Sequence, residues 1–146
     1  MDAPNPCAAP AAATVDPAGE VASPERIAAL PVSDAWKARF RLISAAGGAR
    51  LPLADRLPGG ERLAVSFNLP AFVLGPLWFL AKGLWRQAIT MSALSLLAMT
   101  VVGIVLGLVG LAQVAPLVGW ACMAVFGARA NVAYYVKMAL GRKVWL

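Results

Sequence analysis

The sequence predicts an all-α integral membrane protein built around a hairpin of two transmembrane helices. Residues 87–128 carry no charge, and as one helix at about 1.5 Å per residue they would be roughly 60 Å long. That is twice a hydrocarbon core of about 30 Å, so two spans joined by a turn account for the length. Charged residues are only 14% of the chain, against roughly 25% in soluble domains.

Residues 1–32 are rich in Ala and Pro, with scattered acidic residues. Proline interrupts regular structure, and alanine buries too little surface to offset the entropy lost on ordering. We therefore predict a disordered tail over 1–32. Asp2, Pro4 and Pro6 stand where a signal peptide has its basic and apolar regions, so this start does not resemble one.

Residues 33–66 are predicted to form an amphipathic helix and a connector. The helix is expected from a cap at Ser33 or Asp34 to about residue 46, before a Gly-Gly stop. Its apolar side chains fall on one face: Trp36, Phe40 and Ile43. Such a face suits either a membrane surface or packing against the protein itself. Proline and glycine then break the pattern over 49–61, which predicts a connector.

Residues 67–86 are predicted to form a broken helix that lies at the membrane interface or re-enters the membrane. The uncharged stretch 63–81 approaches the roughly 20 residues that a span needs. Pro70, Gly75 and Pro76 interrupt it, however, and its cleanly apolar part would reach only about 20 Å. Irregular backbone is tolerated at membrane depth only where protein or water satisfies its polar groups.

We place the two spans at residues 88–108 and 112–134, with a basic C-terminal end over 135–146. The turn between the spans carries no basic residue. By the positive-inside bias, the outer ends are cytoplasmic and the turn faces outward. The N-terminal half is then cytoplasmic if 63–81 does not cross, and external if it does. The basic residues that flank the pair are Lys82, Arg86, Arg129, Lys137, Arg142 and Lys143.

Several kinds of chemistry are missing. The chain has no histidine, which excludes histidine acid–base catalysis and histidine–zinc sites. No Asp or Glu follows Glu61, so the membrane part lacks a carboxylate for a proton relay or cation site. Cys7 and Cys122 lack the spacing of a metal site or a disulfide framework. We expect no catalytic residue, metal or cofactor, and no enzyme activity.

The basic balance of the chain, with a pI near 10.0, could suggest nucleic acid as a partner. The basic residues bracket apolar runs instead of lining a polar face, so we expect anionic lipid and no nucleic acid. Gly103 and Gly107 form a GxxxG pattern in the first span, which predicts close helix packing, either within the hairpin or in a homodimer.

A polar and aromatic group ends the second span. Asn131 and Tyr135 are four residues apart and share one side with Tyr134, whereas Arg129 lies on roughly the opposite side. These residues are predicted either to contact a lipid or partner, or to anchor the helix with satisfied polar groups. The full set of candidate contacts is Asn68, Trp78, Trp85, Arg129, Asn131, Tyr134 and Tyr135.

Two motifs carry a family resemblance. The run FNLPAFVLGPLWFL over 67–80, followed by KGLW over 82–85, resembles the signature of the bacterial domain-of-unknown-function family 2628. The run GARAN over 127–131, with Tyr134 and Tyr135, is similar to the closing motif of that family. The resemblance covers about 34–143 and implies a small bacterial inner-membrane protein, without an activity, cofactor or catalytic residue. Pro70 and Ala81 depart from a family preference for bulkier or aromatic residues.

We therefore expect a non-enzymatic accessory or scaffold protein of the bacterial inner membrane, with its N-terminal half and C-terminus in the cytoplasm. Its expected partners are the bilayer and either another membrane protein or a second copy. The alternative is a self-associating channel or transporter component, which requires oligomers because two spans are too few for a pore. The two motifs should meet near the inner face, where we expect any working surface.

Overall fold

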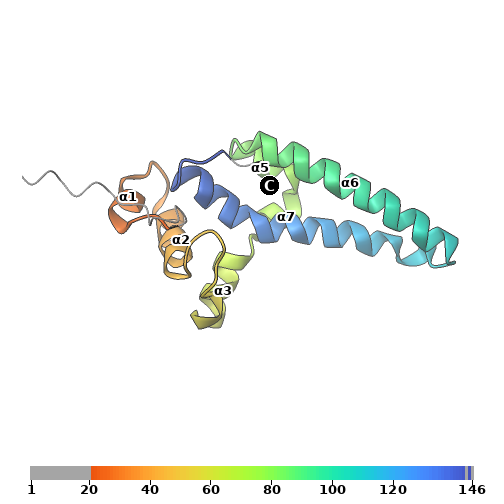
Figure 1. Ribbon diagram of the computed structural model, residues 1–146, viewed down its shortest axis with the longest axis horizontal. Helices are drawn as coiled ribbons and strands as arrows, with labels where there is room; N and C mark the ends of the chain where they lie inside the picture. Colours follow the sequence, from red (N-terminus) through yellow and green to blue (C-terminus); the bar gives the residue numbers. More distant parts are fainter. Residues whose placement is uncertain (1–20, 144, 146) are drawn as a thin grey trace, which may run out of the picture.

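The computed structural model describes residues 21–143 and 145, and within these ranges the chain is helical with no strand (Figure 1). This confirms the predicted all-α class. The helices are α1 (Pro24–Ala29), α2 (Asp34–Ala45), α3 (Gly59–Ser66), α4 (Leu69–Leu74), α5 (Pro76–Ala81), α6 (Trp85–Leu108) and α7 (Ala115–Met138), with short 3-10 helices at Ala54–Arg56 and Ala112–Val114.

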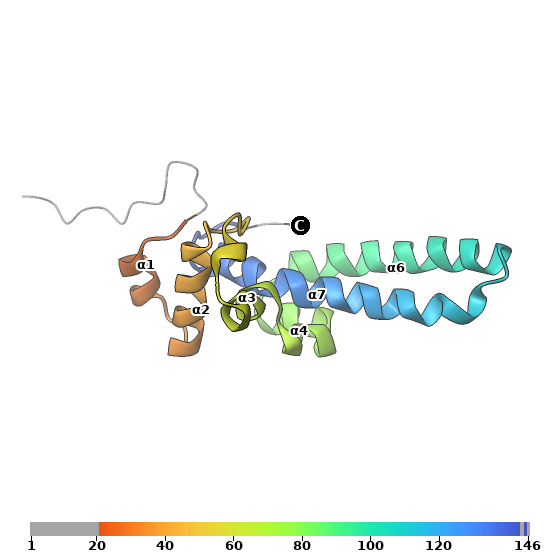
Figure 2. The same ribbon diagram turned by 90° about the horizontal axis from the view of Figure 1, so that it is seen from below.

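Helices α6 and α7 form an antiparallel hairpin that projects away from the short helices (Figures 1 and 2). Each has 24 residues and is about 36 Å long at 1.5 Å per residue. Gly110, with φ of 75°, provides the turn. The helices cover most of the predicted spans, although α7 begins at Ala115 because the 3-10 helix occupies 112–114, and continues to Met138.

The predicted broken helix is interrupted at Gly75, between α4 and α5. Gly75 has φ of 53° and ψ of −126°, outside the helical region. Pro76 follows it and has no N–H with which to continue the helical ladder. A Cβ at Gly75 would also lie 2.9 Å from Cε of Met123 in α7. The chain therefore kinks where it crosses the hairpin, with α4 against α7 and α5 against α6.

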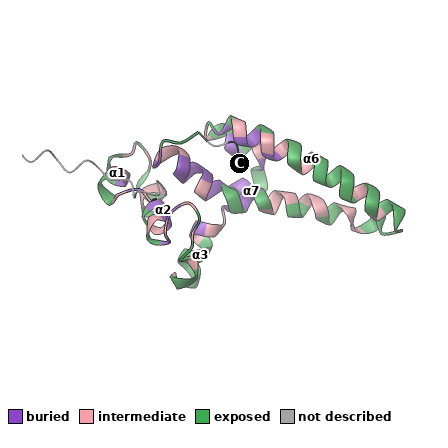
Figure 3. Cartoon of the chain, viewed as in Figure 1, coloured by how far each residue is buried: buried purple, intermediate pink, exposed green. Residues whose placement is uncertain are grey.

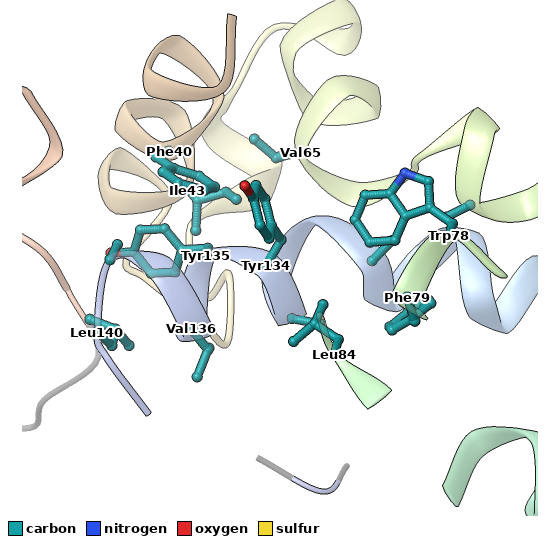
Figure 4. Packing of buried hydrophobic residues seen from close by; sticks show 14 of the residues in the cluster. Phe40, Ile43, Val65, Trp78, Phe79, Leu84, Tyr134, Tyr135, Val136 and Leu140 are labelled. Carbon is teal, nitrogen blue, oxygen red and sulfur yellow. The ribbon is translucent and has the colours of Figure 1, made fainter. Parts of the chain in front are cut away.

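Buried residues gather where the short helices meet the near end of the hairpin, a region we call the base (Figure 3). Phe40 and Ile43 of α2, Val65 of α3, Phe79 of α5 and Tyr135 of α7 are fully buried there (Figure 4). Beyond the base, α6 is open. Of an apolar stretch of 18 residues in this helix, only 6% is buried. The molecule thus consists of a packed base and an apolar arm.

The N-terminal prediction needs correction. A disordered tail over 1–32 is wrong for residues 21–32, which contain α1; residues 1–20 lie outside the described part of the chain. Ser23 caps α1 by accepting the N–H of Arg26 through its hydroxyl. Ile27 is buried against the base. Composition does not predict this helix, because its stability depends on one cap and on one side chain that packs against the rest of the protein.

The predicted connector also contains structure. Residues 49–61 include a 3-10 helix and the start of α3, for which Pro58 is the N-cap. The Pro-Gly-Gly sequence therefore begins a helix instead of breaking one. Helix α2 has nearly its predicted bounds, and Phe40 on its apolar face packs against the ring of Tyr135 at 5.5 Å. Of the two destinations predicted for that face, the structure shows packing against the protein itself.

Gly127 of α7 is buried at the crossing with the α3–α4 turn, and it generates a prediction. An added Cβ would lie 2.8 Å from the Phe67 ring and 3.0 Å from Cβ of Phe72. We predict that Gly127→Ala lowers the free energy of unfolding by about 1–3 kcal/mol through overpacking. Thermal unfolding in mild detergent measures the change.

The matched control for this variant is Gly119→Ala in the same helix, where the nearest atom would be 3.8 Å away. It should be neutral or stabilising by up to about 1 kcal/mol, because alanine favours helix. Equal stabilities of the two variants would contradict the tight crossing at Gly127.

Candidate functional site

The final turns of α7 lie at the centre of the base and bind the backbone of three other segments. The side chains that make these bonds are those of Asn131, Tyr135 and Lys137. The first two are site residues predicted from the sequence. Lys137 was predicted only as a flanking charge, because nothing in the sequence distinguishes it from the other cations beyond the spans.

Asn131 of α7 is fully buried, and its side chain lies at the C-terminal end of α3. Its Nδ2 donates to the carbonyl oxygens of Ala64 at 2.9 Å, Val65 at 3.2 Å and Phe67 at 3.1 Å. These carbonyls belong to the end of α3, where helical partners run out. The Oδ1 of Asn131 accepts from Nδ2 of Asn68 at 2.8 Å. One amide therefore satisfies the last turn of α3 and holds the residue that begins α4.

Asn68 continues this connection. Its Oδ1 accepts the N–H of Ala71 at 3.1 Å, which makes it the N-cap of α4. Its own N–H donates to the carbonyl of Gly127 at 2.9 Å. The motifs over 67–85 and 127–135 therefore meet directly, as the sequence predicts. The paired amides are fully engaged in structure, which favours the anchoring alternative for Asn131.

Tyr135 closes a ring of hydrogen bonds with Ala22 and Ser44. The hydroxyl of Tyr135 accepts the N–H of Ala22 at 2.8 Å, and Oγ of Ser44 donates to the carbonyl of Ala22 at 3.2 Å. Because the single Ser44 proton is used there, Tyr135 donates in its 2.9 Å contact with Oγ of Ser44. The ring joins the segment before α1 to α2 and α7.

Lys137 of α7 binds backbone carbonyls just after the C-terminal end of α5. Its Nζ donates to the carbonyl of Lys82 at 2.6 Å and to that of Gly83 at 3.1 Å. A cation at this position also complements the partial negative charge at a helix C-terminus. The backbone position of Lys82 is therefore fixed by α7, and its own Nζ lies over the ring of Tyr134 at 5.1 Å.

A groove of about 740 Å³ opens between α2, the α3–α4 turn and α5. Its aromatic wall includes Trp36 and Trp78, whose ring centroids are 6.2 Å apart, and the Trp36 ring also meets Tyr134 edge-on at 4.7 Å. Two cations line the groove as well. The guanidinium carbon of Arg39 lies 4.9 Å from the Trp36 ring centre and Nζ of Lys82 lies 5.5 Å from it.

Neither cation of the groove is among the site residues predicted from the sequence. Arg39 lies in α2 and Lys82 directly follows α5, and both reach the Trp36 ring through the packing of the short helices in the base. Burial lowers the pKa of the Arg39 guanidinium from its ordinary value by desolvation. The group stays charged at neutral pH.

Two other predicted contacts lie apart from this group. Trp85 is exposed at the start of α6, and its ring meets that of Trp145 at 6.2 Å, with the Arg86 guanidinium over both. Arg129 is exposed, whereas Asn131 is buried, in keeping with their placement on opposite sides of α7. The described residues contain no group of three or more side chains suited to hold a metal ion.

The GxxxG residues are not packed within the hairpin. Apart from its chain neighbours and the nearby backbone of α6 itself, a Cβ at Gly103 or Gly107 would meet no described atom within 4 Å. Packing inside the hairpin, one of the two predicted alternatives, is therefore wrong for these glycines. A seam with a second chain stays a prediction.

The family model described as "Protein of unknown function (DUF2628)" matches residues 23–139. The chain belongs to this family. The resemblance of the two motifs is thereby confirmed, and the match extends further toward the N-terminus than the motifs indicate, to include α1. Comparison with curated proteins and with solved structures gives no match.

The buried amide of Asn131 generates a stability prediction. Asn131→Ala should lower the free energy of unfolding by about 2–4 kcal/mol, because it leaves buried carbonyls at the end of α3 and the Asn68 amide without partners. Thermal unfolding measures the loss. Relative to the unaltered chain, the variant should show a larger increase in hydrogen exchange in α3 than in α6.

Arg129→Gln, two residues away and exposed, is the control and should change stability by no more than about 0.5 kcal/mol. Unchanged exchange in α3 of the Asn131 variant would contradict the capping role.

Proposed function

We propose that the chain is an integral protein of the bacterial inner membrane, in which α6 and α7 span the bilayer and the base serves as a non-enzymatic scaffold or accessory module. The exposure of α6 carries this proposal. Helix α6 is long and apolar enough to cross a membrane, yet it is almost entirely unburied. An apolar core helix of a soluble protein is mostly buried. Lipid supplies the missing surroundings.

The distribution of charge supports an orientation with the base in the cytoplasm. Lys82 and Arg86 lie at the base end of α6, and Lys137 and Arg142 at the base end of α7. The hairpin turn at residues 109–114 has no charge. Basic residues are retained on the cytoplasmic side of inner membranes.

The broken helix suits the interface on the same side. One face of α4 and α5 is apolar and open, with exposed Leu69, Val73, Leu74, Leu77 and Leu80. Each piece has six residues, or about 9 Å of helix, which is far too short to span. An uncharged face of this kind is stabilised by burial in the headgroup region.

The use of polar groups in the base supports scaffolding over catalysis. Asn131, Tyr135 and Lys137 donate or accept bonds that hold backbone in place. A scaffold needs such rigidity, whereas a reacting group must be free to meet a substrate.

Topology tests the proposal. Reporter fusions at residue 50 and at the C-terminus should report the cytoplasm, and a reporter inserted at residue 111 should report the outside, because the basic residues stay with the base. The protein should remain in the membrane pellet after alkaline carbonate extraction. An external residue 50 would contradict the interfacial placement of α4 and α5, and release by carbonate would contradict membrane integration.

A second candidate function, a self-associating channel or transporter component, is favoured by the open face around Gly103 and Gly107. No described atom would contact a Cβ there, and both residues lie on the unburied part of α6. Small residues spaced by four allow a second helix to approach closely within a membrane.

Crosslinking in native membranes tests self-association. If the seam is used, Gly103→Leu should abolish a discrete homo-oligomer, because the larger side chain keeps the helices apart. Ala98→Leu, at an exposed position on another face of α6, is the control and should leave it intact. Co-purification with a different protein, with no homo-oligomer, would favour the scaffold instead.

A further inference from the structure

We propose that the groove between α2, the α3–α4 turn and α5 binds the headgroup of an anionic phospholipid, with Arg39 and Lys82 as its cationic ligands. This site rests on the membrane placement proposed above and adds a specific ligand to it. The observation that points to it is a pair of cations held against one aromatic ring, Trp36, in a groove with an apolar rim.

Charge is the first argument. Arg39 and Lys82 form no ion pair with any residue that the structure describes, and no carboxylate from that part of the chain lines the groove. Both side chains are half-buried. Their contacts with the Trp36 ring offset part of the desolvation that this placement entails. A phosphate group bound in the groove would supply the missing counter-charge and charge-assisted hydrogen bonds.

Rigidity is the second argument. The carbonyl of Lys82 is held by Nζ of Lys137 at 2.6 Å, which fixes the end of α5. Arg39 precedes Phe40, which is fully buried in the base. The two cations are therefore presented from elements already anchored to α7. A preorganised pair loses less entropy on binding than two mobile side chains.

The rim of the groove decides the class of ligand. Leu63 and Leu69 line it and are 65% and 63% exposed, and Pro70 lies beside them. This rim continues into the open apolar face of α4 and α5. A soluble phosphate would use the cations and leave the leucines in water. A phospholipid engages both, because its phosphate meets the cations while its acyl chains cover the apolar face.

Lipid titration of the purified full-length chain in mild detergent tests the site, with native mass spectrometry as the readout. We expect phosphatidylglycerol to bind about tenfold more tightly than phosphatidylcholine, because both lipids carry a phosphate but the choline cation of phosphatidylcholine is repelled by Arg39 and Lys82. Arg39→Gln and Lys82→Gln should each lower the phosphatidylglycerol affinity by up to about tenfold and the phosphatidylcholine affinity by less, so that the preference shrinks. Lys82→Arg should keep the preference.

Arg41→Gln is the matched control, since Arg41 is an exposed cation of the same helix that does not line the groove. Its affinity should match that of the unaltered chain. Thermal unfolding confirms that each variant is folded. Equal affinity for the two lipids, an equal loss in Arg41→Gln, or loss of the preference in folded Lys82→Arg would overturn the proposal.

Two further outcomes separate the alternatives. If inorganic phosphate alone displaces phosphatidylglycerol at similar concentration, the site takes a soluble anion and the lipid assignment fails. A chain that resists carbonate extraction but shows no preference for phosphatidylglycerol overturns the groove and leaves membrane integration standing. A chain that carbonate releases overturns the membrane proposal itself.

Discussion

The buried side-chain amide of Asn131 is the interaction on which the rest of the base depends. Carbonyls at a helix end cost free energy when they lack partners away from water. Asn131 shares its two amide protons among three carbonyls at and just after the end of α3, and it also binds Asn68, the cap of α4. The positions of α3 and α4 are thereby set by α7. Helix α5 is joined to α4 at the kink at Gly75. The groove lies between α2, the α3–α4 turn and α5.

Helix α7 joins two different environments within one continuous element. Its second half, from Phe126 onward, contains most of its buried residues and packs like a soluble core. Its first half is apolar and contains no buried residue. Gly127 marks the change, because α7 there passes close to the Phe67 and Phe72 side chains. The proposed scaffold and the proposed lipid site both depend on the packed half of α7.

The sequence predicted those features that depend on local chemistry. The uncharged run over 87–128 indicated the hairpin, and Gly75 with Pro76 indicated the break, because each acts through its own backbone or hydropathy. Helix α1 and the start of α3 escaped prediction because their stability comes from distant partners, such as Tyr135 for the segment at Ala22. The approach of Arg39 and Lys82 to one Trp36 ring escaped for the same reason, since no spacing along the chain indicates it.

The hydrogen-bonded ring of Ala22, Ser44 and Tyr135 has a consequence for how the protein is made. During synthesis, α1 to α5 emerge from the ribosome before α7 exists. The N-terminal helices therefore have no centre to pack on until the last helix has been delivered. If the hairpin enters the bilayer as one unit, closure of the ring reports that both of its helices have arrived. Assembly of the base therefore waits for α7.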